Sequence, residues 1–354
     1  MEDGRISTLL NLLIDRYKNN LVDIATKAGQ ANLVEVPRLR RVKIMFSRSV
    51  DLTFSLQICD TVEYLNLAIV PHEYLCSLFG SHGSPKVFPN LQYLNVYSPL
   101  DCIDSATEEL VQRHISCSRL YLPKLRSLIL VNNYKYCPIL STAVLPRQMD
   151  ILSVSVSPQT IMMLAKSAIP QVQQLSIQQH MCTDIERGST VAALRHIFHQ
   201  TSIAANAMLT FDSPTRSIMP SELGGACITY LSVRRGVTLT MLAEFMNSLY
   251  ALTRLEAHLC QQCKSELELA TPDKAEHPLR PFAARINYFR LDYDYSTDSI
   301  VPFIRYILPR LPHIETLDSY MTFREPIVQF VEEYKSLYPH LSIVKLVLNP
   351  SNLW

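Results

Sequence analysis

The chain has 354 residues, of which 48% are hydrophobic, and its 33 basic and 32 acidic residues give a formal net charge of +1. This apolar content excludes a disordered chain, and the balanced charge argues against a general affinity for nucleic acid or for anionic membranes. Only 8 residues are glycine, so glycine-rich loops that hold phosphate groups are not expected. The length allows two or three compact domains or one elongated array.

Nine cysteines are scattered along the chain at irregular spacings. An odd number without a pattern disfavours the disulfide framework of a small secreted protein and favours reduced thiols. The apolar stretch at residues 9–14 is interrupted by Asn11 and is too short for a signal peptide. No apolar run approaches the roughly 18 residues that a membrane-spanning helix needs. We therefore expect a protein of the cytoplasm or nucleus that has no membrane partner and no nucleic-acid partner.

The first 36 residues differ from the rest of the chain. Residues 5–28 carry apolar side chains at helical spacing, which predicts one amphipathic helix or two. We expect residues 1–36 to form a helical cap, because a stack of repeats exposes its apolar core at each end and needs a cover there. At the other end, residues 349–354 form a short tail.

From residue 37 onwards one short pattern recurs, in which a proline is followed by apolar residues two, five and seven positions later. Several copies lack the proline but keep the apolar spacing. The central apolar residues of the copies are Val42, Leu65, Leu94, Leu128, Leu152, Leu175, Leu231, Leu255, Phe289, Leu317 and Val344. Most successive gaps are 23–34 residues, and one gap of 56 residues leaves room for a further copy around Leu209 and Phe211. A recurrence of this length is typical of a solenoid of stacked units.

Between these predicted strands the apolar residues change to a spacing of three and four, after a helix-capping residue or a proline. This spacing predicts helices at residues 105–115, 157–169, 189–203, 238–249, 297–308 and 325–338. One unit is then a helix, a turn, a proline that starts the next strand, and a short strand. Neither half can bury its apolar face alone, so the units must stack, with parallel strands joined by right-handed crossovers.

The predicted fold is therefore an α/β solenoid of about 11–12 degenerate units over residues 37–348, with strands on the concave side and helices on the convex side.

The pair Cys260 and Cys263, with His258 just before it, is the best candidate for a metal or redox site. Zinc needs four ligands, usually as two spaced pairs, and the sequence has no second CxxC pair; His277 is the only nearby completion. The alternative is that both cysteines are loop thiols that follow the strand at Leu255.

Other polar motifs favour structural roles. Residues 292–298 begin like a calcium loop, but Thr297 stands where the turn glycine is required and Phe303 where the bidentate glutamate is required, so a capped helix fits better. His196 and His199 lie on a predicted helix without an HExxH motif around them. The sequence contains no P-loop and no G-x-S-x-G motif. We therefore expect no enzyme activity, no cofactor and no bound metal.

The strongest basic cluster is RLRRVK at residues 38–43. Within its strand, Arg41 and Lys43 point away from the core while Val42 points into it. A solvated first strand explains this cluster, and a phosphate-binding or nuclear-import role is the alternative.

The residues on either side of each central apolar residue point to the opposite, concave face of the sheet. Tyrosine precedes the central residue in four copies. Tyrosine is common in strands generally, but tyrosine and arginine also contribute most of the binding energy at protein interfaces. We expect this face to bind a protein partner through Tyr64, Asn66, Tyr93, Asn95, Gln174, Tyr230, Arg254, Tyr288 and Arg290.

Five segments resemble the leucine-rich-repeat portion of F-box-type proteins, especially the large divergent sets of early-branching fungi: FPNLQYLNV, YLPKLRSLILV, CPILSTAVLP, LTRLEAHL and RLPHIETL. The resemblance covers residues 37 to 348 and implies a leucine-rich-repeat horseshoe. It further implies a non-enzymatic protein-interaction module that recognises substrates for a ubiquitin ligase, with a Skp-type adaptor and a cullin as partners.

Two features depart from the family pattern. Residues 1–36 contain no LP-led F-box segment, and only the copy with Leu128 and Leu130 shows clearly the following asparagine, Asn133, that is usual in these repeats. The alternatives to a ligase adaptor are a metal or redox protein that uses Cys260 and Cys263 and a structural scaffold without a ligase role.

Overall fold

The computed structural model describes most of the chain, and its described residues are 2–27, 33, 36–46, 60–70, 86–98, 120–132, 140, 143–166, 169–179, 187–201, 206–211, 227–259, 280–293, 306–320, 324–334, 336, 338–340 and 345–349. The chain divides into two compact units. The first unit comprises Met1–Ile177 and Ile203–Ala205, and the second comprises Gln178–Ser202 and Asn206–Trp354.

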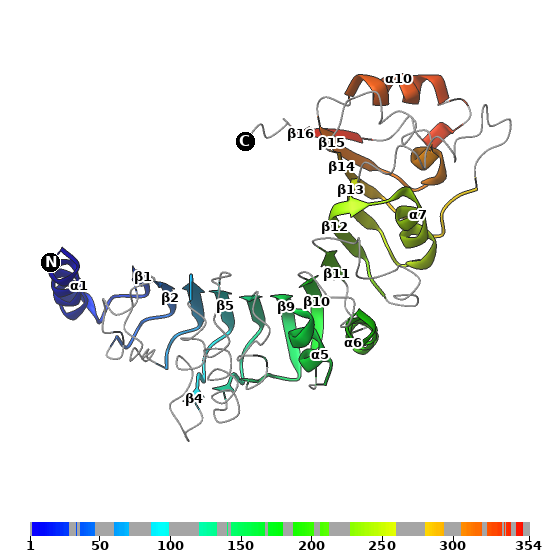
Figure 1. Ribbon diagram of the computed structural model, residues 1–354. Helices are drawn as coiled ribbons and strands as arrows, with labels where there is room; N and C mark the ends of the chain where they lie inside the picture. The colour runs from blue at the N-terminus through cyan, green and yellow to red at the C-terminus, as the bar shows by residue number, and fades with distance from the viewer. Residues whose placement is uncertain are drawn as a thin grey trace. The chain divides into compact units, whose positions relative to one another are not determined.

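The first unit is a row of parallel strands that follows the N-terminal helix α1 (Glu2–Tyr17) (Figure 1). Its strands lie in the order β1 (Asp23–Lys27), β2 (Arg41–Met45), β3 (Tyr64–Ala68), β5 (Tyr93–Ser98), β7 (Ser127–Asn132), β9 (Gln148–Val156) and β10 (Gln171–Gln179). Helix α5 (Pro158–Lys166) connects the last two strands. A second, smaller parallel sheet consists of β4 (Lys86–Val87), β6 (Leu120–Tyr121) and β8 (Ala143–Val144).

The second unit repeats this design with more helices among its described residues. Its parallel strands lie in the order β11 (Asn206–Phe211), β12 (Tyr230–Val237), β13 (Arg254–Leu259), β14 (Tyr288–Tyr293), β15 (Thr316–Tyr320) and β16 (Lys345–Asn349). The helical elements are α6 (Arg187–Gln200), α7 (Leu239–Ser248), η3 (Leu308–Arg310) and α10 (Arg324–Tyr334). The protein is thus α/β with parallel sheets, and in the described residues neither sheet closes into a barrel. No described helix is long and apolar enough to cross a bilayer.

The predicted strand positions are confirmed with one exception. Eleven of the proposed central residues lie in strands, including Leu209, which stands opposite Leu231 in β12 and fills the long gap. The exception is the last copy, in which Leu317 stands opposite Leu346 rather than Val344. The error arose because Val344 and Leu346 are both apolar and two residues apart, so the alternation fits either register.

The prediction of helix throughout residues 5–28 is wrong in its second half. Helix α1 ends at Tyr17, and Asp23–Lys27 form β1, which pairs with β2. Ile24 and Thr26 are β-branched and half-buried, and they alternate with exposed neighbours as a strand requires. β1 therefore extends the sheet by one strand, where the sequence predicted part of a helical cap.

Four of the predicted helices are confirmed, because α5, α6, α7 and α10 lie within or close to the expected segments. Helix α7 begins after Thr238, whose hydroxyl accepts a hydrogen bond from the Met241 amide at 3.2 Å. The predicted helix at residues 105–115 lies outside the described residues, and of the helix at 297–308 only the end is described, where the chain passes into η3.

In four copies, at Pro37, Pro89, Pro123 and Pro312, the recurrent proline lies in a turn before the strand, whereas Pro170 directly precedes β10 as predicted. The amide of the residue two positions after the proline donates to the carbonyl of the residue before it, as in Leu39 to Val36 at 3.1 Å and Leu125 to Leu122 at 3.2 Å. This is a β-turn with proline at its second position, where the fixed φ of proline is suitable. In these copies the strand begins only after the turn, so the turn sets the direction of entry into the sheet.

Buried side chains explain why the strands stack. In β2 and β3 the burial alternates, with Val42, Ile44, Leu65 and Leu67 buried between residues that retain exposure. The central residues of the described strands are buried to the same degree in both units. One apolar face of each sheet therefore forms the core, and the other face carries the polar and aromatic residues.

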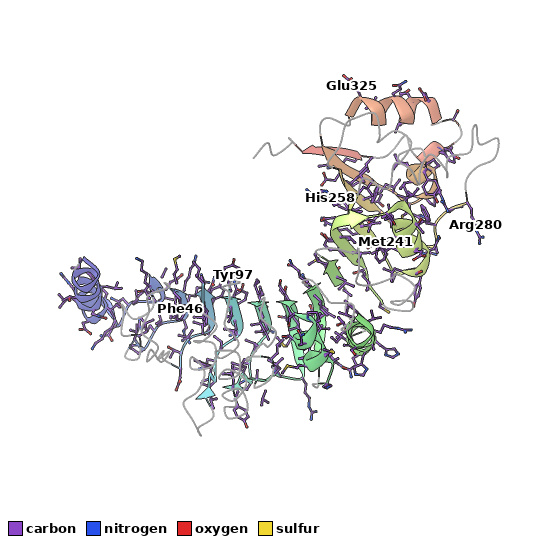
Figure 2. All side chains as sticks on the ribbon, in the orientation of Figure 1. Phe46, Tyr97, Met241, His258, Arg280 and Glu325 are labelled. Atoms are coloured by element: carbon purple, nitrogen blue, oxygen red, sulfur yellow. The ribbon has the colours of Figure 1, made fainter. Side chains whose placement is uncertain are left out.

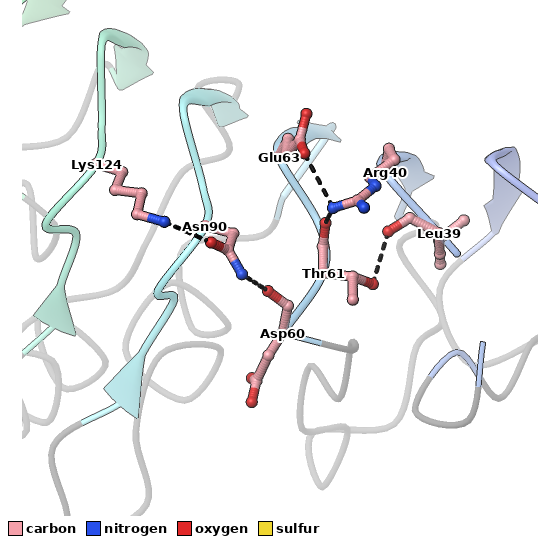
Figure 3. Close-up of polar contacts among 7 residues, drawn as sticks. All are labelled: Leu39, Arg40, Asp60, Thr61, Glu63, Asn90 and Lys124. Atoms are coloured by element: carbon pink, nitrogen blue, oxygen red, sulfur yellow. Dashed lines mark hydrogen bonds and ion pairs between the residues drawn. The ribbon is translucent and has the colours of Figure 1, made fainter. Parts of the chain in front are cut away.

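Polar side chains at the strand entrances connect neighbouring strands (Figure 3). The Thr61 hydroxyl donates to the Leu39 carbonyl at 2.9 Å, and the Asn90 amide donates to the Asp60 carbonyl at 2.9 Å. In the second unit the Thr253 hydroxyl donates to the Thr229 carbonyl at 3.1 Å. The hydrogen bond from Thr61 is partly buried and the other two are exposed, and each one links a strand entrance to the preceding copy.

Candidate binding face

In each unit the predicted binding residues share one side of the long row of parallel strands, which we call the tyrosine face. It carries the residues directly before and after the buried central residue of each strand. Tyr64 and Asn66 flank Leu65 on β3, and all three residues stand opposite their counterparts Tyr93, Leu94 and Asn95 on β5. The prediction that the tyrosines occupy equivalent positions on neighbouring strands is therefore confirmed in the geometry of this pair.

In the first unit the two predicted tyrosines form a stacked pair. The ring centroids of Tyr64 and Tyr93 are 4.2 Å apart and the ring planes differ by 5°. Burial, and then the neighbouring hydroxyl of Tyr64, raise the pKa of Tyr93 above its ordinary value. Gln174 lies on β10, is exposed, and has no described contact with this pair.

In the second unit Arg254 lies between two tyrosine rings. Its guanidinium carbon is 4.8 Å from the centroid of Tyr230 and 4.1 Å from the centroid of Tyr288. The strand register causes this arrangement, because Tyr230, Arg254 and Tyr288 stand directly opposite one another on β12, β13 and β14. Such a position over an aromatic face is favourable for a cation.

Two carboxylates complete this cluster, and the sequence prediction did not include them. Arg254 Nη2 donates to Glu256 Oε1 at 3.1 Å, and the Tyr288 hydroxyl donates to Asp318 Oδ2 at 2.6 Å. Asp318 is only 6% exposed. Glu256, Arg290 and Asp318 also stand opposite one another across three strands, so charges of alternating sign run along the face. That alternation at one offset was the signal in the sequence that identifies the two acids.

The charge network and its burial raise the pKa of three of its members. Burial, followed by the Glu256 carboxylate, raises the pKa of Tyr230 to about 12. Burial and the Asp318 carboxylate raise the pKa of Tyr288 further. Burial lowers the pKa of Arg254, but Glu256 and the two tyrosine hydroxyls outweigh it and leave this pKa above its ordinary value. The raised pKa values extend to higher pH the range in which both tyrosines keep their hydroxyl protons and Arg254 keeps its charge.

The described residues contain no cluster of three or more potential metal ligands. The candidate pair Cys260 and Cys263, together with His277, lies outside the described residues, and so does most of the calcium-like segment. His196 and His199 are exposed on α6, where the His196 ring nitrogen lies 2.8 Å from the side-chain amide of Gln200. This contact is typical of a helix surface.

No protein-family model matches the chain, and no curated protein is significantly similar to it. Function is therefore inferred from the residues of the tyrosine face.

Proposed function

We propose that the protein is a non-enzymatic recognition module whose tyrosine face binds another protein. The observation that carries the proposal is the ordered arrangement of large amphipathic side chains there, namely the Tyr64–Tyr93 stack and the Arg254 cluster. Aromatic and arginine side chains provide most of the energy at interfaces, and side chains that are already ordered lose less entropy on binding. Both groups keep polar atoms that can bind a partner.

We also propose that the repeated units form a leucine-rich-repeat solenoid with the tyrosine face as its concave side. The support is the regular recurrence of one turn, one strand register and one pattern of burial. A further regularity is that, at eight of the described strand entrances, two successive amides donate to one carbonyl of the preceding copy, as Glu63 and Tyr64 do to Arg40. In this proposal α1 and β1 together cover the first end of the array.

By resemblance to F-box-type repeat proteins, the proposed role is substrate recognition in a ubiquitin-ligase assembly that includes a Skp-type adaptor and a cullin. Affinity capture of the full chain from a native lysate tests this role. Recovery of the adaptor together with a cullin would support it. Recovery of other proteins without these two would favour an adaptor that acts on its own.

The binding face itself is tested by substitution. The four substitutions Tyr64→Ala, Tyr93→Ala, Tyr230→Ala and Tyr288→Ala, combined in one variant, should abolish capture of the partner. The matched control is the double variant Tyr17→Ala and Tyr250→Ala, because both of these tyrosines are exposed and neither lies on the face. Circular dichroism checks that both variants fold. Equal capture by the two variants would contradict the assignment of the face.

A further inference from the structure

Charge is unevenly distributed over the tyrosine face of the first unit. On β1 and β2 the face carries Asp23, Lys27, Arg41 and Lys43, all of which are exposed. In the described part of the chain neither Arg41 nor Lys43 has an ion-pair partner. From β3 to β9 the equivalent positions carry no charge. The first unit thus has a basic edge beside an uncharged surface.

The uncharged surface carries both apolar and small polar side chains and is partly open to solvent. Tyr97, labelled in Figure 2, lies on β5 four residues after Tyr93 and is 44% exposed. Ile129 on β7 and Ile151 on β9 lie half-buried on the same face. At the basic edge, Met45 on β2 is 42% exposed. Apolar side chains interspersed with uncharged polar ones, beside a charged rim, are compatible with a protein-binding site.

Between the basic edge and the aliphatic residues lie the tyrosine stack and two amides. Asn66 and Asn95 stand opposite one another and are half-buried. Amide side chains offer both donors and an acceptor, as a polypeptide backbone requires. Across the face the side chains are therefore cationic on β2, aromatic and amide on β3 and β5, and partly aliphatic on β7 and β9.

We propose that this face of the first unit binds an extended polypeptide segment that carries acidic side chains followed by an aliphatic side chain and lies across the strands. This inference rests on the proposed function and specifies the partner. Charge complementarity selects the acidic end, because Arg41 and Lys43 attract carboxylates and suppress basic segments. A nucleic acid fits less well, since its phosphates would repeat over β7 and β9, where the described face has no cation.

The strand spacing sets the length of the segment. Neighbouring strands lie about 4.8 Å apart, so β7 is about 14 Å and β9 about 19 Å from β2. An extended chain advances about 3.3–3.6 Å per residue. The aliphatic side chain should therefore follow the acidic side chains by about four to six residues.

Fluorescence polarisation with the full chain tests the inference. The labelled peptide carries two glutamates and, about five residues later, two leucines in a serine-rich background. Its controls replace the glutamates by lysines, replace the leucines by serines, or shorten the spacing to about two residues. A labelled single-stranded oligonucleotide tests the competing ligand. We expect each control peptide to bind at least about tenfold more weakly, and binding of the first peptide to weaken as salt rises.

Substitutions assign the binding to the basic edge. The double variant Arg41→Glu and Lys43→Glu should weaken binding about tenfold or more, whereas Arg147→Glu, an exposed position in the turn before β9, should not. Equal binding of the lysine peptide, tighter binding of the oligonucleotide, or no peptide binding at about 1 mM would overturn the inference. If one of these results is found and the four-tyrosine variant nevertheless fails to capture the protein that the unaltered chain captures, the proposed function stands and only the class of partner is wrong.

Discussion

Replacement of Arg254 by alanine should destabilise the second unit locally. Arg254 stacks between the rings of Tyr230 and Tyr288 and pairs with Glu256, so one substitution removes three contacts. The two rings also lose the side chain that separates them, while the Glu256 carboxylate loses its cation. The effect should therefore concentrate on β12, β13 and β14.

The magnitude follows from the exposure of the cluster. Each cation–aromatic contact at a partly exposed site contributes about 0.5–1 kcal/mol. The ion pair adds about 0.2–1 kcal/mol, because the arginine and glutamate side chains are 46% and 19% exposed and solvent screens their charges. Coupled contacts do not add fully, so we expect a loss of about 1–2 kcal/mol. Arg254→Lys keeps the charge but loses planar stacking, and it should show about half of this loss.

Hydrogen exchange followed by mass spectrometry measures the change, because it reports the local free energy of opening for peptides from β12 to β14. The matched control is Arg285→Ala, which removes an exposed arginine outside the strands and should change protection by less than about 0.5 kcal/mol. If Arg254→Ala reduces protection in these strands no more than Arg285→Ala does, the contacts of Arg254 do not stabilise β12 to β14, and the prediction is refuted.

Three further predictions concern the fold and its pH dependence. Because the pKa values of Tyr230 and Tyr288 are raised in the folded protein, the contribution of these two tyrosines to stability should be constant below about pH 10 and fall as the pH rises toward 12 and beyond, as urea midpoints compared with those of the Tyr230→Phe and Tyr288→Phe double variant will show. A contribution to stability that does not change with pH, or that increases above pH 10, would contradict the raised pKa values of these tyrosines. Thr238→Ala removes the hydroxyl that accepts from Met241 and should cost about 0.5–2 kcal/mol, seen as faster hydrogen exchange in α7; unchanged exchange there would contradict the capping role. Leu209→Ala should cost about 2–5 kcal/mol in urea denaturation because Leu209 is fully buried, and a loss below about 1 kcal/mol would mean that β11 is not a regular copy.

The sequence predicted most strands because apolar core residues recur at every second position in them, even where the residues between them are also buried. The same rule found β11 inside a long gap, since Leu209 is flanked by Met208 and Thr210 in the expected way. The rule failed where alternation was compatible with two answers. Val344 and Leu346 both fit the template, and only the pairing of β15 with β16 selects Leu346.

The N-terminal strand was missed because helical and strand spacing overlap in a short segment. Five residues, Asp23–Lys27, cannot establish a period, and the neighbouring edge of β2 decides their conformation. Tertiary pairing outweighs local propensity in such cases.

The binding face was predictable as a set of positions but not as a set of contacts. Register alone places Tyr64 opposite Tyr93 and Arg254 opposite Tyr288. The role of Asp318 depends on how the Tyr288 hydroxyl is directed, which side-chain packing determines. Alignment of the copies places Glu256 and Asp318 on the face but cannot supply that direction, and so their contacts were missed.

Site-specific photocrosslinking tests the central claim most directly. A photoreactive amino acid replaces Asn66 on the tyrosine face in one version of the full chain and exposed Arg147 outside the face in another, and each is irradiated in a native lysate. The proposal predicts a crosslinked protein from position 66 that excess unlabelled chain competes away, and no such product from position 147. The absence of a specific product from position 66, or the same products from both positions, would contradict the claim that this face binds a protein.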